Sequence, residues 1–145
     1  MGLTRRKKSI HNLNRVMILC ANIVHINNIK PGDTVSYGRT FTAKRDTKIA
    51  VLPIGYADGY PRILSNKAQV LVRGQRCNVV GTICMDHTMV DVTDVEGVSC
   101  GDEAVLIGRQ EKSEITAKEV ADLAGTIHYE IATGIQKRVK REYIE

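Results

Sequence analysis

Residues 55–62 combine tyrosine, carboxylate and guanidinium side chains in one short segment. The segment contains Tyr56, Asp58, Tyr60 and Arg62, together with two glycines and a proline. The glycines and the proline predict a loop, and glycine lets a backbone approach a ligand closely. Such a loop can bind a polar ligand or move a proton, but turns of this composition are also common for purely structural reasons.

Three other positions allow the same two interpretations. An apolar strand is expected to end in Cys84-Met85-Asp86, and therefore in a carboxylate. Tyr37 lies in an otherwise apolar and threonine-rich segment, and Tyr129 follows a predicted helix by a few residues. A tyrosine in a strand is usually packed with its hydroxyl in water, so each position taken alone is undecided between function and packing.

The segments around these positions are predicted to be mostly β-structure. The expected strands cover residues 16–26, 34–43, 47–54, 68–73, 76–80, 81–85, 88–92, 103–107 and 128–144. Gly74-Gln75 is placed as a type II′ hairpin turn between two of them. Many short strands with frequent turns are typical of a closed barrel or a sandwich.

One helix is expected. Thr116 and Glu119 have the spacing of a capping box, an apolar stripe follows, and Gly125 is placed to end the helix. We therefore predict a mainly β fold, a small closed or partly open β-barrel with one short helix. It would form one domain over residues 16–145, which is long enough to bury a core.

The net charge of +5 is concentrated near the amino end. Residues 5–8 supply four positive charges, and the rest of the chain holds 17 basic against 16 acidic residues. The domain itself therefore shows no basic face for nucleic acid, and one Phe and no Trp leave little for stacking on bases. We expect residues 1–15 to be a disordered basic tail, although such a tail can also contact nucleic acid or a membrane.

The cysteines and histidines give no metal-ligand pattern. None of the four cysteines forms a C-x-x-C pair, and the four histidines show no ligand spacing. Most cysteines lie in apolar runs, which indicates buried free thiols in a reducing cytosol.

The apolar run at residues 16–24 is too short to span a membrane. A signal peptide is disfavoured because polar residues precede that run and no A-x-A site follows it. We expect a cytoplasmic protein.

Four segments together resemble the C-terminal domain of the alanine racemases. They are residues 35–41 (VSYGRTF), 52–62 (LPIGYADGYPR), 80–86 (VGTICMD) and 127–130 (IHYE). Their order and spacing fit that family, and the resemblance extends from about residue 16 to the end. It implies an isomerase that interconverts L- and D-alanine, supplying D-alanine for peptidoglycan. The complete enzyme would be a homodimer with pyridoxal 5′-phosphate as cofactor.

The resemblance also implies roles for individual residues near the substrate. Tyr37 matches the tyrosine that serves as one of two catalytic bases. Met85 matches the residue whose backbone N–H holds the substrate carboxylate, and Asp86 matches an acidic neighbour at that site. Tyr56 matches a tyrosine that lines the substrate entrance.

Other matched residues belong to the cofactor and the entrance. Tyr129 matches a tyrosine that hydrogen-bonds the cofactor phosphate, whereas Arg62 and Ile127 match outer entrance positions. Thr82 departs from family members that have an arginine there, so the entrance charge is expected to be weaker.

The chemistry requires two bases. The cofactor acts as an electron sink that makes the α-proton removable, and racemisation removes it from one face and returns it on the other. In the family the bases are a lysine and a tyrosine, and a free tyrosine with a pKa near ~10 needs help near neutral pH.

The lysine lies on a (β/α)8 barrel, which takes about 250 residues. Only 36 residues precede Tyr37, and none of the ten lysines lies in a matching motif. Each active site of the family combines the barrel of one subunit with residues of the partner's C-terminal domain. We therefore expect this chain to be inactive alone.

Two alternatives remain. One is a domain of a racemase with broader amino-acid specificity, because pocket residues that set side-chain size lie largely on the barrel. The other is a non-catalytic β-barrel binding module, which the near-neutral charge of the domain disfavours.

Overall fold

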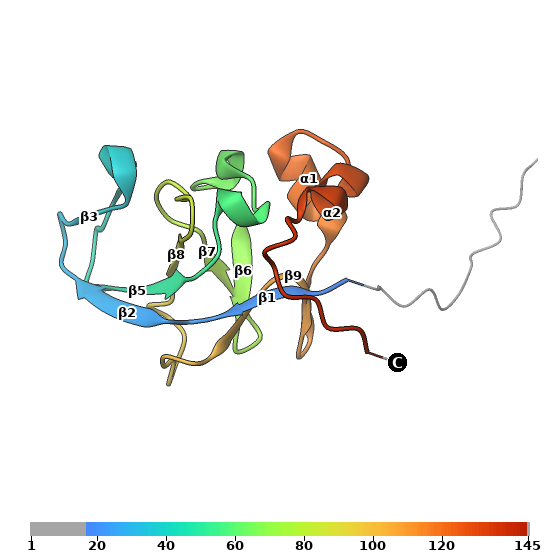
Figure 1. Cartoon of the computed structure of the whole chain (residues 1–145). Coiled ribbons are helices and arrows are strands. Elements are labelled where there is room, and N and C mark those ends of the chain that lie inside the picture. Colours follow the sequence, from blue (N-terminus) through green and yellow to red (C-terminus); the bar gives the residue numbers. More distant parts are fainter. Residues whose placement is uncertain (1–16, 145) are drawn as a thin grey trace, which may run out of the picture.

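The computed structural model describes residues 17–144 as antiparallel sheets with two helices at one end (Figure 1). The strands are β1 (Leu19–Asn22), β2 (His25–Ile29), β3 (Thr34–Val35), β4 (Phe41–Thr42), β5 (Thr47–Leu52), β6 (Gln69–Val72), β7 (Gln75–Asn78), β8 (Thr88–Asp91), β9 (Glu103–Gln110) and β10 (Ser113–Ile115). The helices are α1 (Ala117–Ala124) and α2 (His128–Gly134), and three 3-10 turns are η1 (Tyr37–Arg39), η2 (Tyr56–Asp58) and η3 (Arg62–Leu64). The predicted tail, residues 1–15, lies outside the described residues.

The strands form three separate sheets. One has the order β1-β9-β6-β7, with β10 also paired to β9, the second has the order β2-β5-β8, and β3 pairs with β4. The main core includes Leu52, Leu71 and Leu106 of the strands together with Val120 of α1 and Ile131 of α2, all buried. The apolar faces of two sheets and two helices thus share one core.

The mainly β prediction is confirmed, but the sheets do not close into the barrel that was given as one form of the fold. The two larger sheets share a core, but among residues 17–144 the pairing between them is limited to an isolated bridge between Val79 and Val90, and they do not close. The segment expected to be a strand at residues 81–85 has no strand partner. Its backbone bonds instead to side chains and to the turn after β5. The Ile83 N–H donates to Ser65 Oγ (2.8 Å), and the Cys84 carbonyl accepts from the Tyr56 N–H (3.1 Å). Those backbone groups are therefore not available for a ladder that would join the sheets.

The expected strand at residues 16–26 is two strands, β1 and β2, in different sheets. The expected hairpin of β6 and β7 is present, but its turn is one residue earlier than predicted. Val72 pairs with Gln75, so the loop is Arg73-Gly74. Both residues have positive φ, 50° and 76°, which is the type I′ geometry that matches the twist of the strands.

Two helices are present where one was predicted. The cap of α1 is confirmed, because Thr116 Oγ1 accepts from the Glu119 N–H (2.9 Å) and Gly125 follows with φ 73°. Residues 128–144, expected to be a strand, instead begin with α2. Ile127, Ile131 and Ile135 recur at every fourth position, which is a helical period.

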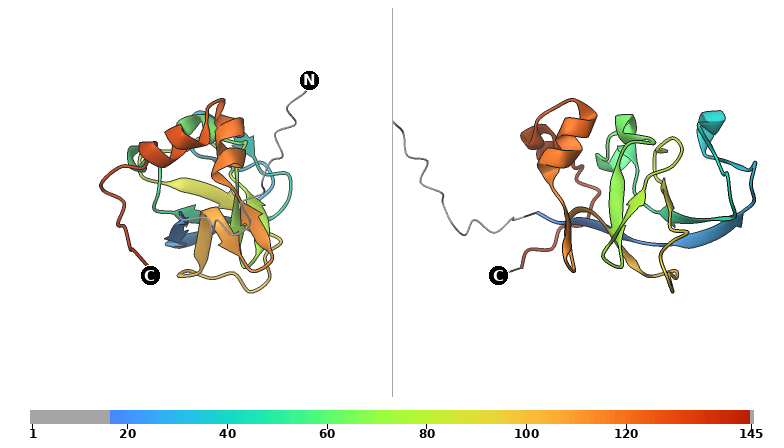
Figure 2. Two further views of the ribbon diagram at one scale, coloured as in Figure 1. Left: turned by 90° about the vertical axis from the view of Figure 1, so that its right-hand side faces the viewer. Right: turned by 180° about the vertical axis from the view of Figure 1, so that it is seen from behind.

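The turns and helices project from one edge of the sheets. In Figure 1, η1, the turns after β5, the loop before β8, and α1 and α2 all lie along the upper edge. The two further views in Figure 2 show the same arrangement. Within residues 17–144, no helix has the length and apolar character needed to cross a membrane.

The cysteines are less buried than expected. Cys77 is buried, Cys84 is half-buried, and Cys20 and Cys100 are exposed, all as free thiols. The prediction that most of them are buried is therefore wrong. Burial raises the pKa of the Cys77 thiol to about 11.

Candidate functional site

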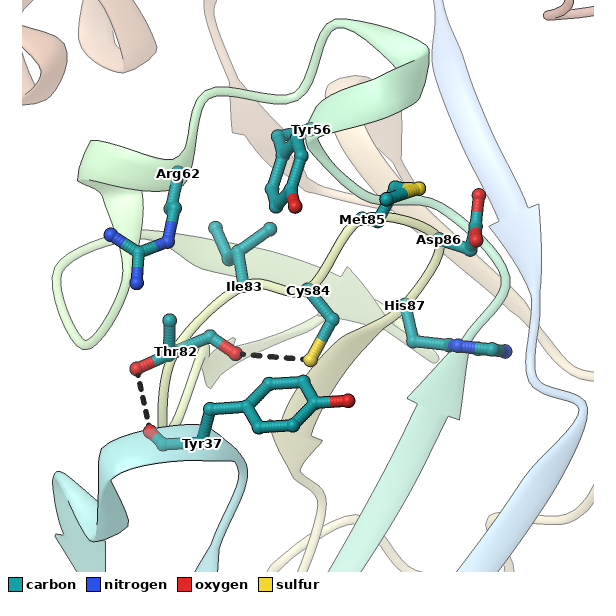
Figure 3. Close-up of a pocket in the computed structure, with 9 residues that line it drawn as sticks. All are labelled: Tyr37, Tyr56, Arg62, Thr82, Ile83, Cys84, Met85, Asp86 and His87. Carbon is teal, nitrogen blue, oxygen red and sulfur yellow. Dashed lines mark hydrogen bonds between the residues drawn. The ribbon is translucent and has the colours of Figure 1, made fainter.

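An open hollow of about 460 Å³ lies at the edge from which the turns project (Figure 3). It brings together residues that are far apart in the sequence. The lining consists of Tyr37, Tyr56, Arg62, Thr82, Ile83, Cys84, Met85, Asp86 and His87. Five of the seven residues predicted from the family motifs therefore line one hollow, together with Thr82.

Tyr37 lies on η1, not in the strand that was expected. The preceding Ser36 has φ 65° and ψ −177°, a region that is almost restricted to glycine. Its Oγ donates to the Thr82 carbonyl (2.5 Å), and Thr82 Oγ1 donates to the Tyr37 carbonyl (2.9 Å). A Cβ at Gly81 would lie 2.8 Å from the Val35 carbonyl oxygen, so only glycine fits there. These contacts fix the backbone from which the Tyr37 ring projects.

The loop that carries Tyr56 is bonded directly to the segment that carries Met85. The Tyr56 N–H donates to the Cys84 carbonyl (3.1 Å), and the Ala57 N–H donates to the Met85 carbonyl (3.0 Å). Gly55 permits this approach, since a Cβ there would lie 2.1 Å from the Cys84 oxygen. The prediction that a glycine of this loop allows close backbone approach is confirmed, although the neighbour is the protein itself.

The segment that carries Met85 also has backbone N–H groups without hydrogen-bond partners. Within residues 17–144, the N–H groups of Met85, Asp86 and His87 donate to no acceptor. Successive unpaired N–H groups in a turn are a common binding site for an anion. Arg62 is the only Lys or Arg among the lining residues. The hollow can therefore hold a small carboxylate beside the hydroxyl groups of Tyr37 and Tyr56.

Arg138 joins two carboxylates at the side of the hollow. Its Nε lies 2.9 Å from Asp58 Oδ1, and its Nη2 lies 2.8 Å from Asp86 Oδ1. Asp58 is buried and also accepts from the Gly55 N–H (2.9 Å) through Oδ2. Asp58 therefore has a structural role in the loop, whereas Asp86 lies in the hollow.

Tyr60, which lies in the predicted loop, belongs to the core. Its side chain is 1% exposed, and its hydroxyl has no hydrogen-bond partner among the described residues. Burial raises the pKa of this hydroxyl above its ordinary value. Tyr60 is therefore not available to a ligand in the hollow.

Tyr129 and Ile127 lie outside this hollow. Tyr129 lines a second, mostly apolar hollow of about 600 Å³ beside α1 and α2. Both side chains are exposed, and within residues 17–144 the Tyr129 hydroxyl has no hydrogen bond. The structure thus separates the predicted site residues into two groups on one edge of the domain.

Sequence reasoning missed several residues that form or support the site. Ser36, Cys84 and Arg138 were not predicted as site residues, although the first two stand inside the quoted motifs. Arg138 lies in a stretch of basic residues whose pattern resembles a solvated surface, and only the fold brings it to Asp86. Among residues 17–144, no group of His, Cys, Asp and Glu could hold a metal ion.

Comparison with known proteins extends the resemblance to nearly the whole chain. Residues 16–143 match the family described as alanine racemase, C-terminal domain. The alanine racemase of Halothermothrix orenii is 49% identical over 144 residues, which is 98% of this chain and 38% of that protein. The chain thus spans little more than a third of the length of this curated relative.

Solved structures agree with the sequence relatives. Alanine racemase from Streptomyces coelicolor superposes with a TM-score of 0.84 at 42% identity, over 89% of this chain and 33% of that one. Alanine racemase from Bartonella henselae, solved with covalently bound pyridoxal phosphate, superposes with a TM-score of 0.81 at 38% identity, over 88% and 34%. The chain belongs to the alanine racemase C-terminal domain family.

Proposed function

We propose that this chain supplies the base and the substrate-binding edge of a racemase that interconverts L- and D-alanine. The proposal rests on the hollow in which the Tyr37 and Tyr56 side chains lie with the unpaired N–H group of Met85. A barrel domain, in a homodimer, would complete the active site, and residues 16–145 would act as one domain.

Each residue of the hollow has a simple task. In its deprotonated form, the Tyr37 side-chain oxygen would take the α-proton from one face of alanine, and the hydroxyl so formed would return a proton to that face. The Met85 N–H binds the substrate carboxylate and so fixes which bond at the α-carbon faces Tyr37. Tyr56 and Arg62 line the path by which the substrate enters, with Ile127 further out.

Pyridoxal phosphate fits the described residues only in part. When bound, this cofactor withdraws electrons from the α-carbon and weakens the bond to the α-proton. Tyr129 offers an exposed hydroxyl without a partner among residues 17–144, which suits a phosphate oxygen. None of the residues lining the first hollow is a lysine, and in the proposed enzyme the amine that carries the cofactor comes from the barrel.

A hybrid enzyme tests the proposal. The barrel of the Halothermothrix orenii alanine racemase would be joined to this chain in place of its own C-terminal domain, which is 49% identical. With pyridoxal phosphate present, we expect the hybrid to convert L-alanine to D-alanine, measured by chiral chromatography. The chain alone and the barrel alone should give no conversion, since each lacks one of the two bases.

The parent enzyme of the barrel is the matched control. A hybrid that binds the cofactor and forms dimers, but does not racemise alanine, would show that the proposal is wrong.

A further inference from the structure

Arg138 connects the two loops that build the hollow. It follows α2 in the chain, while its guanidinium reaches Asp58 in the turn η2 and Asp86 in the loop before β8. Backbone bonds also hold the tail in place, because the Gln136 N–H donates to the Asp58 carbonyl (2.9 Å). A Cβ at Gly59 would lie 2.1 Å from the Gly134 carbonyl oxygen, so the tail packs tightly on this loop.

The loops joined by Arg138 are the ones that carry the substrate-binding groups. Asp58 lies two residues after Tyr56, and Asp86 follows Met85 directly. A guanidinium can bond two carboxylates at once because its N–H groups point in fixed directions. Arg138 therefore links the two loops at a second place. The first link is the pair of backbone bonds from the loop after Gly55 to the Cys84 and Met85 carbonyls, and the second runs through Arg138 from Asp58 to Asp86.

The charge of Asp86 makes this contact important for binding an anion. The Asp86 side chain is 48% exposed and stands next to the free Met85 N–H. An unneutralised carboxylate at this position would repel the carboxylate of an incoming ligand. Arg138 supplies the compensating positive charge at 2.8 Å.

We propose that Arg138 is a positioning residue that fixes and neutralises Asp86, so that the Met85 N–H can donate to the carboxylate of an amino-acid substrate. The identity of the substrate rests on the racemase function proposed above. The positioning of Asp86 by Arg138 is a property of this domain and can be tested without that function. Arg138 contacts neither the substrate nor the reacting atoms in this assignment.

The positioning part is tested on the 145-residue chain by amide hydrogen exchange. Arg138→Gln should speed exchange in residues 55–58 and 84–87 by roughly tenfold, because loops that lose a cross-link open more often. Arg141→Gln is the matched control, with the same change of charge in the same tail. Among residues 17–144, Arg141 donates only to the Ile135 carbonyl (3.1 Å), so its removal should leave both loops unchanged. Equal exchange in the two variants would exclude the positioning role.

The electrostatic part is tested in the hybrid enzyme. Arg138→Gln should raise KM for alanine roughly tenfold with a smaller change in kcat, because one carboxylate near the substrate loses its counter-charge. Arg138→Lys should raise KM less, since its ammonium still supplies a positive charge although it cannot bridge both carboxylates. Adding Asp86→Asn to Arg138→Gln should restore much of the lost affinity, which a purely structural role of Arg138 would not allow.

The outcomes separate the two proposals. An inactive hybrid with the unmodified chain contradicts the proposed function, and the exchange result still decides the positioning role. An active hybrid whose KM is the same in Arg138→Gln and Arg141→Gln contradicts the proposal for Arg138 alone. A raised KM that Asp86→Asn fails to lower shows that charge is not the cause, and it also overturns the proposal.

Discussion

Tyr37 owes its position to a strained residue. Ser36 has backbone angles that cost about 1–3 kcal/mol in a residue other than glycine. The hydrogen bond from Ser36 Oγ to the Thr82 carbonyl holds it there, and Gly81 leaves room for it. Strain of this kind persists where the surrounding contacts over-determine the backbone, and it is frequent at functional sites. The Tyr37 side chain is 75% exposed, so the strain serves its placement and not its burial.

Replacing Tyr37 with Phe in the hybrid enzyme tests its role as a base. The phenyl ring keeps the packing and loses only the hydroxyl, so folding should change little. Exchange of the α-hydrogen of L-alanine with deuterated solvent should fall by roughly 100- to 10,000-fold, the usual contribution of a general base. Exchange from D-alanine should persist, because the family resemblance assigns that face to the barrel lysine. Racemisation in both directions should collapse, since each direction uses both groups.

NMR can follow the α-proton of each enantiomer separately. Tyr143→Phe is a suitable control, because Tyr143 is 91% exposed in the tail. L-alanine exchange at the unmodified rate in Tyr37→Phe would mean that Tyr37 is not the base.

An ion pair joins helix α1 to the sheet, in addition to the buried side chains that it adds to the core. Arg76 of β7 donates through Nη1 and Nη2 to the Glu119 carboxylate, at 2.6 and 3.0 Å. The same guanidinium also donates to the Glu114 carbonyl (2.6 Å). The bonds from Arg76 hold the pKa of the Glu119 carboxyl below its usual value. The Glu119 side chain therefore pairs with the sheet, and only the Thr116 half of the predicted capping box is seen.

The ion pair between Arg76 and Glu119 should make the stability of the fold depend on pH. A carboxyl with a lowered pKa in the folded state stabilises the fold above its unfolded pKa, and this contribution is lost as the pH falls through the folded value. Glu119→Gln should therefore lower the free energy of unfolding by about 1 kcal/mol at pH 7. The two proteins should approach equal stability well below the ordinary carboxyl pKa of 4.5. Urea unfolding at pH 7 and in acid measures the difference.

Asp122→Asn provides the comparison on the same helix. Asp122 pairs with Lys118 one turn away, and both side chains are well exposed, so this pair is worth little. A difference between wild type and Glu119→Gln that stays constant with pH would contradict the role given to the ion pair.

On the scale of the whole domain, apolar side chains are exposed along the edge that carries the turns and helices. Tyr37, Ile63, Met85, Ile127 and Tyr129 are each at least half exposed. Their elements project from one edge in Figure 1. Under the proposed function this edge would face a barrel domain, so a domain in isolation would leave it uncovered. Exposed apolar patches of this kind tend to find partners.

The isolated chain is therefore expected to self-associate. Sedimentation velocity should show a weight-average mass that rises with protein concentration above that of the 16.1 kDa monomer. Ile127→Asp should reduce the association. Val24→Asp should not, because Val24 is similarly exposed, at 52%, but lies in the connection between β1 and β2, away from this edge. A strict monomer at high concentration, or equal effects of the two substitutions, would show that this edge does not cause self-association.

The sequence by itself determined the features that depend on neighbouring residues. The cap and end of α1 follow from Thr116 and Gly125, because side-chain caps and left-handed glycines act within one turn. The hairpin at Arg73-Gly74 was predicted within one residue for the same reason. The family motifs also indicated which residues to place in a site, although their roles stay proposals.

The tertiary structure decided what depends on distant partners. Whether residues 81–87 form a strand or a loop is settled by bonds to Ser65, Tyr56 and Ala57, and this choice keeps the sheets from closing into the expected barrel. Residues 128–134 fit both a strand and a helix pattern, and the burial of Ile131 against the core selects the helix. Only the fold brings Arg138 to Asp86 across 52 positions of the chain. Such contacts have no local signal, because their free energy comes from groups that the sequence keeps far apart.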